Sequence, residues 1–434
     1  MSSNISNDTP IFAVPEVNLV PVSGHLSQMA AIPPSRMFII NKSLKVYRER
    51  NPERPVFDAS QGDGGASLPG VPRAILERAA ELQIEHGTAY DLPFGTPAFR
   101  QAVIEQYWRI DPGLGIGPAN VLGTSGGRDA LVKAYQAMLA LGHGREGDVI
   151  ITTRVPWISY NWGPYSVGAN VLYAPGKPEA GWSLTPDSIR ESVRFAERSG
   201  RKAAGVIITS PDNPTGKTLS LEEQACLAQE ALRLGVAFVL FDWMYHYVTD
   251  EQPADLNTFL RLFDAEDRKR LMFLDGLTKS LGASNIRCCH LIAAEEVIQF
   301  AAARASHTVM PSYFALAVAM AAYEMGYSEA CRGIVEPTNT SRRLLEQYLQ
   351  EQRVRFILGK GYYAFIEVSQ WLERKGWADS EPLGQYLAEE HGVAVVPGVY
   401  FSPYGAQWIR FSYANAPEYT LGAAQRLMEG LYAL

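Results

Sequence analysis

Residues 271–290 read LMFLDGLTKSLGASNIRCCH, and this stretch decides the fold. The apolar run at its start indicates a short buried strand. Polar groups follow at once, because Lys279, Asn285 and Arg287 stand in a loop of small residues. Ligands of an open α/β sheet bind beyond the carboxyl ends of its strands, so this loop is a candidate site.

The same arrangement recurs towards the amino terminus. From Val121 onward, short β-branched runs alternate with longer amphipathic stretches, and the runs are VLGTSGG (121–127), DVIITTR (148–154), GVIITSP (205–211) and VAFVLFDW (236–243). Such alternation is typical of a mostly parallel sheet with helices on both faces. The sequence therefore predicts an α/β protein.

The length of the chain favours two domains. Its 434 residues exceed what a single core usually spans. Near residue 326 the pattern changes to a long polar helix and then to short strands separated by Gly and Pro turns, which predicts a smaller α+β domain. Residues 1–35 show no periodicity, so we expect an arm that gains order by packing on another surface, such as a second subunit.

Composition and charge exclude several classes of function. Asp and Glu outnumber Lys and Arg by 46 to 39, which gives a formal charge of -7, so we expect no nucleic-acid partner. The amino terminus lacks the basic and apolar regions of a signal peptide, and we expect a cytoplasmic protein without membrane contact. The 4 cysteines show no C-x-x-C spacing and are interpreted as free thiols, with no metal site.

Four strand ends carry unusual chemistry. They are Gly126-Gly127-Arg128 at a helix start, the turn at 211–216 that contains Asn213, the segment 242–245, and Lys279. Each has an ordinary interpretation when it is taken alone, namely a tight loop, a plain turn, a helix cap and a solvated amine. Their order and spacing favour a shared site instead.

The whole set resembles the fold type I pyridoxal-phosphate (PLP) aminotransferases of classes I and II. Residues 279–287, KSLGASNIR, match the lysine signature of that family. Residues 90–100, YDLPFGTPAFR, are similar to its Y-x-x-x-x-G-x-x-x-x-R element, and residues 157–160, WISY, to its cofactor-stacking segment. Two more segments resemble its carboxyl-terminal motifs, and they are PGVYF (397–401) and WIRFSYA (408–414).

That resemblance implies a domain organisation. A large PLP-binding domain would span residues 81–325, with its mostly parallel sheet sandwiched by helices. Residues 36–80 and 326–434 would together form the small domain, preceded by the arm at 1–35. The resemblance also implies a homodimer with shared active sites.

The resemblance implies a role for each residue around the cofactor ring. Lys279 would hold the PLP aldehyde as a Schiff base and, once displaced, would move the substrate Cα proton. Asp242 would keep the pyridine nitrogen protonated. Asn213 and Tyr245 would donate hydrogen bonds to the phenolic oxygen, which lowers the pKa of the Schiff base. Trp157 would stack on the ring face.

The phosphate-binding residues are implied in the same way. The backbone amides of Gly126 and Gly127 would bind the phosphate at a helix start, where the helix dipole favours an anion. The guanidinium of Arg287 would add a charged fork. Thr278 would supply a hydroxyl, and Tyr90 of the partner subunit would reach the same phosphate.

Three positions depart from the family pattern. Gly276 stands where the family commonly has a serine that binds phosphate, and Cys289 stands where it usually has a glycine. We therefore expect some repacking beneath the cofactor. Arg128 stands where a small or polar residue is common, and either a phosphate contact or a substrate contact would explain it.

These features predict an aminotransferase that moves an amino group between an amino acid and a 2-keto acid. Arg410 would bind the substrate α-carboxylate through two parallel hydrogen bonds, with Asn213 as a second contact. The alternative is a PLP-dependent lyase, cyclase, oxidase or C–C bond-forming enzyme that acts through the same external aldimine. A third hypothesis, a PLP-sensing regulator, fits poorly because the residues before the fold are too few for a DNA-binding module.

Overall fold

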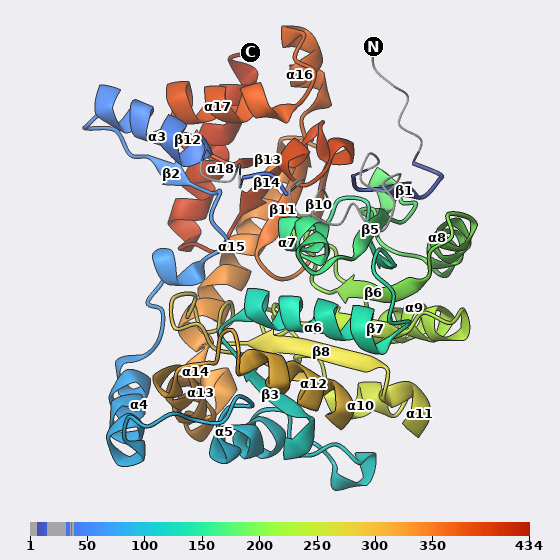
Figure 1. The fold of residues 1–434 in the computed structure, drawn as a ribbon. Helices are drawn as coiled ribbons and strands as arrows, with labels where there is room; N and C mark the ends of the chain where they lie inside the picture. Colours follow the sequence, from blue (N-terminus) through green and yellow to red (C-terminus); the bar gives the residue numbers. More distant parts are fainter. Residues whose placement is uncertain (1–6, 15–31, 35, 37–38) are drawn as a thin grey trace.

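The structure, a computed structural model, describes residues 7–14, 32–34, 36 and 39–434 (Figure 1). Most of the predicted arm, 1–35, therefore lies outside the described residues. Within the described part of the arm, strand β1 (Ile11–Phe12) pairs antiparallel with β5 (Asn170–Tyr173). This portion of the arm is thus ordered by the sheet of its own chain.

An eight-stranded sheet forms the centre of the larger part of the molecule. Its strands follow the spatial order β1, β5, β4 (Val149–Thr152), β6 (Ala203–Thr209), β7 (Phe238–Asp242), β8 (Leu271–Gly276), β9 (Cys289–Ile292) and β3 (Val121–Thr124). The five strands from β5 to β8 are parallel, whereas β1, β9 and β3 add antiparallel pairs. The predicted mostly parallel sheet is confirmed.

Helices cover both faces of this sheet, which explains why its strands are buried along nearly their whole length. One face packs against α6 (Gly127–Leu141) and α12 (Glu295–Ala305). In the view of Figure 1, α6 lies above strand β8 and α12 lies below it. The other face contributes to an apolar cluster that also contains side chains of α4 (Arg73–His86), α5 (Pro97–Ala102), α8 (Pro186–Arg198), α9 (Leu221–Arg233), α10 (Leu256–Leu260), α13 (Tyr313–Met325) and α14 (Tyr327–Ala330). Two shorter helices complete this part, α7 (Ile158–Trp162) and α11 (Ala265–Arg268).

Local sequence signals set the helix boundaries. Ser220 accepts a hydrogen bond from the Glu223 amide while the Glu223 carboxylate accepts one from the Ser220 amide, a capping box that starts α9. Thr185 and Ser188 make the same reciprocal pair at the start of α8. Both helices therefore begin at fixed residues after a strand, which fixes the length of the intervening loop.

A four-stranded antiparallel sheet forms the smaller part of the molecule. Its strands follow the order β10 (Phe356–Leu358), β11 (Tyr363–Glu367), β14 (Trp408–Ser412) and β13 (Val396–Pro397). A separate parallel pair joins β12 (Val393–Ala394) to β2 (Phe57–Asp58). The helices of this part are α3 (Ile39–Arg50), α15 (Arg332–Glu351), α16 (Ser369–Lys375), α17 (Ser380–His391) and α18 (Pro417–Tyr432). A smaller α+β unit is what the sequence predicts for this region.

The amino-terminal segment joins both parts. Helix α3 packs on α17, whereas α4 packs on α13 at the edge of the larger part. The predicted boundary at residue 80 falls inside α4, and the division into domains stays a prediction. No helix within the described ranges has both the length and the apolar character that spanning a membrane requires.

Candidate active site

The predicted site residues gather at one edge of the large sheet. Strands β6, β7 and β8 are neighbours and run parallel, so their carboxyl ends lie side by side. Asn213 follows β6 by four residues, Asp242 is the last residue of β7, and Lys279 follows β8 by three. Three functional groups from distant parts of the sequence thus meet at this edge.

The amine of Lys279 is held between aromatic rings and one backbone acceptor. Its Nζ donates a hydrogen bond to the carbonyl oxygen of Gly62 and lies 5.8 Å from the ring centroids of Tyr245 and Tyr362. The hydroxyl of Tyr362 donates to the backbone carbonyl of Lys279 itself. These contacts fix both ends of the lysine and keep the amine at the sheet edge.

Asp242 is a buried carboxylate with two hydrogen-bond donors. Tyr160 donates to Oδ2 at 2.7 Å, and the backbone amide of Met244 donates to Oδ1 at 3.1 Å. Burial, with a smaller contribution from the charge of Asp275, raises the pKa of Asp242 to about 6, despite the opposing effect of the donors and of Lys279. A cation placed beside this carboxylate would restore its ionised form.

The phenols of Tyr245 and Tyr363 meet above the lysine. Their hydroxyl oxygens lie 3.1 Å apart, and both side chains are buried. Burial raises the pKa of the Tyr245 phenol far above its usual value, so this hydroxyl keeps its proton. Tyr245 can therefore donate a hydrogen bond to an oxygen of a bound ligand.

Arg410 and Asn213, the two residues predicted to contact the substrate, form a buried pair. Nη1 of Arg410 donates to Oδ1 of Asn213 at 2.9 Å, and Nη2 donates to the carbonyl oxygen of Ser60 at 2.7 Å. Nε of Arg410 is buried and finds no acceptor within the described part of the chain. A buried guanidinium that lacks an anionic partner is costly, so this fork is suited to an incoming carboxylate.

The start of α6 forms a cradle against Arg287. Gly126 precedes the helix with φ of 87°, and a Cβ atom at this position would lie 2.3 Å from Nη2 of Arg287. The guanidinium donates to the carbonyl oxygens of Ser125 at 3.2 Å and Ser284 at 3.0 Å, and it remains exposed. A glycine is needed here for both backbone conformation and space.

A second cation lies beside this cradle. The guanidinium of Arg128 is 5.6 Å from the ring of Trp157, which is half-buried. Partial burial and then the charge of Arg287 lower the pKa of Arg128. Two arginines that repel each other at a helix amino terminus are suited to an anion, because an anion between them would remove the repulsion.

Gly276 and Cys289, two of the three departures from the family pattern, face each other across the β8–β9 pair. A Cβ atom on Gly276 would lie 2.6 Å from both Cα and Sγ of Cys289. The thiol lies 3.6 Å from the hydroxyl oxygen of Thr278, and burial raises the pKa of Cys289 to about 12. The two departures are therefore complementary, because the absence of a side chain at Gly276 leaves room for the neutral thiol of Cys289 on the adjacent strand.

Tyr90 differs from the other predicted site residues because its side chain is almost fully exposed to solvent. Its side chain is 97% exposed, so it makes almost no contact with its own chain. It follows α4, whose Ile84 is also exposed at 81%. Exposed large apolar side chains that lie together indicate a surface covered by another molecule.

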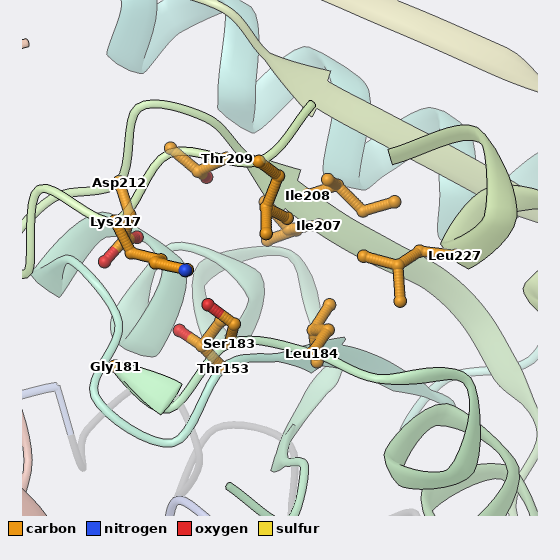
Figure 2. Close-up of a pocket in the computed structure, with 11 residues that line it drawn as sticks. Thr153, Gly181, Ser183, Leu184, Ile207, Ile208, Thr209, Asp212, Lys217 and Leu227 are labelled. Atoms are coloured by element: carbon orange, nitrogen blue, oxygen red, sulfur yellow. The ribbon is translucent and has the colours of Figure 1, made fainter. Parts of the chain in front are cut away.

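The turn that carries Asn213 is stabilised by hydrogen bonds within the turn and by close packing against β11. The hydroxyl and the amide of Thr215 both donate to Asp212, while a Cβ atom on Gly216 would lie 2.1 Å from the carbonyl oxygen of Tyr363. Beneath the turn lies a cavity of about 20 Å³, and Figure 2 shows Lys217 and Ser183 on its polar side. This volume suits about one water molecule and no larger ligand.

Four site residues were not identified from the sequence by role. Tyr160 lies in a segment that matches the family, but its bond to Asp242 links two separate segments and has no local signal. Tyr363 and the backbone of Ser60 and Gly62 reach the site from the smaller part of the molecule. The glycines at 62, 64 and 65 were a visible signal, because such runs mark close backbone approach.

The arrangement supplies four chemical functions. Lys279 provides an amine for imine formation, and Asp242 provides a buried carboxylate that favours a cationic ring nitrogen. The guanidinium groups of Arg128 and Arg287 beside the start of α6 are suited to an anion such as a phosphate. Arg410 is suited to a carboxylate, because its Nε has no acceptor among the described residues and its Nη groups donate only to neutral oxygens. These groups fit a phosphorylated pyridine aldehyde together with an amino acid.

Comparison with known families agrees with this chemistry. The family described as aminotransferase class I and II matches residues 56–426. The aspartate aminotransferase of Geobacillus stearothermophilus is 26% identical over 411 residues, which cover 92% of this chain and 97% of that protein. The aspartate/prephenate aminotransferase of Thermus thermophilus is 25% identical over 412 residues, which cover 92% of this chain and 96% of that protein.

Solved structures show the same fold. The aspartate aminotransferase of Thermus thermophilus with maleate superimposes with a TM-score of 0.78 at 24% identity, covering 93% of this chain and 98% of that chain. An aminotransferase from Mycobacterium tuberculosis gives a TM-score of 0.77 at 20% identity, covering 94% and 98%. The arrangement of the two sheets described above is thus that of an established fold.

Proposed function

This chain belongs to the class I and II aminotransferase family, and we propose that Lys279 carries pyridoxal 5'-phosphate and that the enzyme moves an α-amino group from an amino acid to a 2-keto acid. One observation carries the proposal. The carbonyls of Ser60 and Gly62 accept hydrogen bonds from Arg410 and Lys279 respectively. Carbonyls two residues apart are separated by roughly 7 Å at most, so the carboxylate fork and the amine serve one small substrate.

Lys279 and Arg410 would act in sequence on the substrate. Arg410 would bind the α-carboxylate through its guanidinium, whose Nε has no acceptor among the described residues and whose Nη groups donate to the neutral oxygens of Asn213 and Ser60. Held there, the amino acid presents its amino group and α-carbon towards Lys279. The freed lysine amine then takes the α-proton, and proximity converts this transfer into an intramolecular step.

The cofactor-binding groups would be those around the sheet edge. When bound, PLP supplies an electron-accepting ring for the electrons of the broken Cα–H bond. Asp242, oriented by Tyr160, would hold the ring nitrogen in its protonated form. Asn213 and Tyr245 would donate to the ring oxygen, and Trp157 would cover the ring face.

The phosphate would bind at the start of α6. Gly127, the first residue of the helix, offers its backbone amide there, whereas the amide of Gly126 donates to the carbonyl oxygen of Thr124 at 2.8 Å and would have to turn to the phosphate. Arg287 and Thr278 lie beside the same helix start. We assign Arg128 to the phosphate as well, because its repulsion by Arg287 is relieved by an anion shared between the two guanidinium groups. Its contact with Trp157 then ties the phosphate end to the ring end.

A homodimer with shared sites is part of the proposal. The exposed apolar side chains Ile84, Tyr90, Leu92, Val309 and Phe314 come from α4, α13 and the segments that adjoin these two packed helices. Covering them with a second copy would remove this apolar surface from water. Tyr90 would then lie against the partner, where its hydroxyl can reach the partner's phosphate site.

The function is tested by measuring amino-group exchange. Aspartate with 2-oxoglutarate is the first pair to assay, because the relatives from Geobacillus stearothermophilus and Thermus thermophilus are aspartate and aspartate/prephenate aminotransferases, and a panel of other amino and keto acids follows. We expect keto-acid formation that is abolished in Lys279→Ala. A protein that binds PLP yet exchanges no amino group with any pair would contradict the proposal, and products with altered carbon connectivity would favour the lyase or cyclase alternative.

A further inference from the structure

Tyr363 touches both ends of the site. It is the first residue of β11, and its register partner on β14 is Ser412, so the side chain of Arg410 lies diagonally beside it on the same face. Its hydroxyl meets that of Tyr245 at 3.1 Å, and its ring centroid lies 4.2 Å from Cζ of Arg410. One side chain of the smaller part thus contacts a ring-binding residue and the carboxylate-binding residue.

The chain makes room for this hydroxyl. A Cβ atom on Gly62 would lie 1.7 Å from the hydroxyl oxygen of Tyr363. Any other residue at position 62 would therefore displace the phenol. Because the Gly62 carbonyl also accepts from Lys279, the same backbone turn positions the lysine amine and the Tyr363 hydroxyl.

Proton counting gives the pair a direction. Each phenol has one proton to donate and can accept through its oxygen. If Tyr245 gives its proton to the ring oxygen of a ligand, its own oxygen must accept in the contact with Tyr363. Tyr363 is then the donor, and a chain of two hydrogen bonds runs from Tyr363 through Tyr245 to the ligand, each bond strengthening the next.

We propose that Tyr363 is a positioning residue: its hydroxyl commits the Tyr245 proton to the cofactor's ring oxygen, and its ring holds Arg410 by a cation–π contact. This inference rests on the proposed function. It assigns the two contacts of Tyr363 to separate steps, because the hydroxyl acts on the cofactor and the ring acts on substrate binding.

Charged and titratable groups face the two phenols from several elements. Lys279 approaches from the segment after β8, and Arg410 from β14. Tyr362 adjoins Tyr245 with ring centroids 5.4 Å apart. A substitution at 363 must therefore be compared with one at 245, so that effects from these neighbours cancel.

Tyr363→Phe tests the hydroxyl. We expect the apparent pKa of the cofactor absorbance band, titrated in the PLP-loaded enzyme, to rise by about half a pH unit, because the ring oxygen loses indirect support. Tyr245→Phe should raise it further. The double variant should match Tyr245→Phe alone, since Tyr363 acts through Tyr245, and the PLP dissociation constant should follow the same order.

Tyr363→Leu tests the ring. Maleate, a dicarboxylate probe, should bind Tyr363→Phe as tightly as wild type but bind Tyr363→Leu about fivefold more weakly, because only the second variant loses the cation–π contact. Melting temperatures of the cofactor-free proteins check that all variants fold.

The outcomes separate this inference from the proposed function. A wild-type protein that forms no cofactor absorbance band contradicts both. If the wild-type protein forms the band and the apparent pKa of that band is the same in Tyr363→Phe, the result contradicts the inference but not the proposed function. Additive effects of Tyr363→Phe and Tyr245→Phe would also overturn it, because they would show that the two hydroxyls act independently.

Discussion

At the scale of single residues, Gly276 and Cys289 show how two unusual positions explain each other. Each looks like an isolated departure in the sequence, but antiparallel pairing of β8 and β9 places them face to face. The glycine leaves the space that the cysteine fills. The thiol takes up a position next to Thr278 and beneath the first residue of α6, where it adjoins the proposed phosphate site.

A double-mutant cycle tests this exchange. Gly276→Ser alone should destabilise the protein by about 1–3 kcal/mol, because its Cβ overlaps Cys289. Cys289→Gly alone should also destabilise, by leaving a void in the strand pair. The double variant should recover at least ~1 kcal/mol relative to the sum of the single effects, measured by urea unfolding of cofactor-free protein.

Simple additivity in that cycle would contradict the exchange. The effect of this pair on the proposed phosphate site is tested by comparing the dissociation constants of PLP and of pyridoxal, which lacks the phosphate. If the double variant changes the dissociation constant of PLP and leaves that of pyridoxal unchanged, the pair acts at the phosphate end. Equal changes for both ligands would place its effect elsewhere.

Asp242 makes the stability of the cofactor-free enzyme depend on pH. Its folded pKa of about 6 lies above the ordinary 3.8, so the folded state binds a proton more tightly between these values. The free energy of unfolding therefore falls as pH rises through this window, and the loss is complete above it. Asp242→Asn cannot ionise, so it avoids this fall in the free energy of unfolding. The variant should be more stable than wild type at pH 7.5 by on the order of 2–3 kcal/mol.

The difference between Asp242→Asn and wild type should shrink as pH falls below about 6 and should vanish only below the ordinary pKa of 3.8, where the carboxyl is protonated in both states. Asp212, whose pKa burial also raises to about 6, is present in both proteins, so the effect of its burial cancels, and the charge of Asp242 is the smallest cause of its shift. PLP should raise the melting temperature of wild type more than that of Asp242→Asn. Equal stabilities of the two cofactor-free proteins across pH 4–8 would contradict the burial argument.

At the scale of elements, the strand ends were predictable and the contacts between segments were not. Asn213, Asp242 and Lys279 follow apolar runs, so the alternating pattern places them at one sheet edge. Tyr160, Tyr363 and the Gly62 carbonyl reach that edge through tertiary packing, which no local pattern encodes. The antiparallel pairing of β9 with β8 and β3 was likewise invisible, because periodicity does not report strand direction.

The start of α6 yields a prediction for Arg128. Arg128→Gln should weaken PLP binding severalfold, because one of two charged partners of the phosphate is lost. Arg304→Gln on α12 is the control, since that arginine stacks on Phe300 and donates to its carbonyl oxygen. Equilibrium dialysis measures both. An unchanged PLP dissociation constant with a raised KM for aspartate would assign Arg128 to the substrate instead.

At the scale of the whole molecule, the sequence predicted the mostly parallel sheet, whereas the division of the amino-terminal region at residue 80 stays a prediction. The change of pattern near residue 326 falls at the junction of α13 and α14, shortly before α15 begins at Arg332 and leads into the smaller sheet. Helix α4, however, packs on α13 across the predicted boundary at residue 80. Helical periodicity predicts that such a helix exists, but its partner is chosen by tertiary packing.

The proposed dimer makes a further prediction. Ile84→Asp places a charge on the exposed apolar surface beside α13, so it should shift the protein to a monomer in light-scattering measurements. PLP affinity should fall with it, because Tyr90 of the partner subunit is lost. Lys45→Asp, on the exposed face of α3, is the control and should leave assembly unchanged. A dimer that persists in Ile84→Asp would contradict this interface.

The central claim is that the amine of Lys279 bonds covalently to the cofactor. Borohydride reduction of the PLP-loaded enzyme, followed by peptide mapping by mass spectrometry, tests it most directly. We predict that one peptide, containing residue 279, gains the mass of a reduced pyridoxyl-phosphate group, and that Lys279→Ala gains none. Labelling of other lysines with Lys279 unmodified would contradict the account.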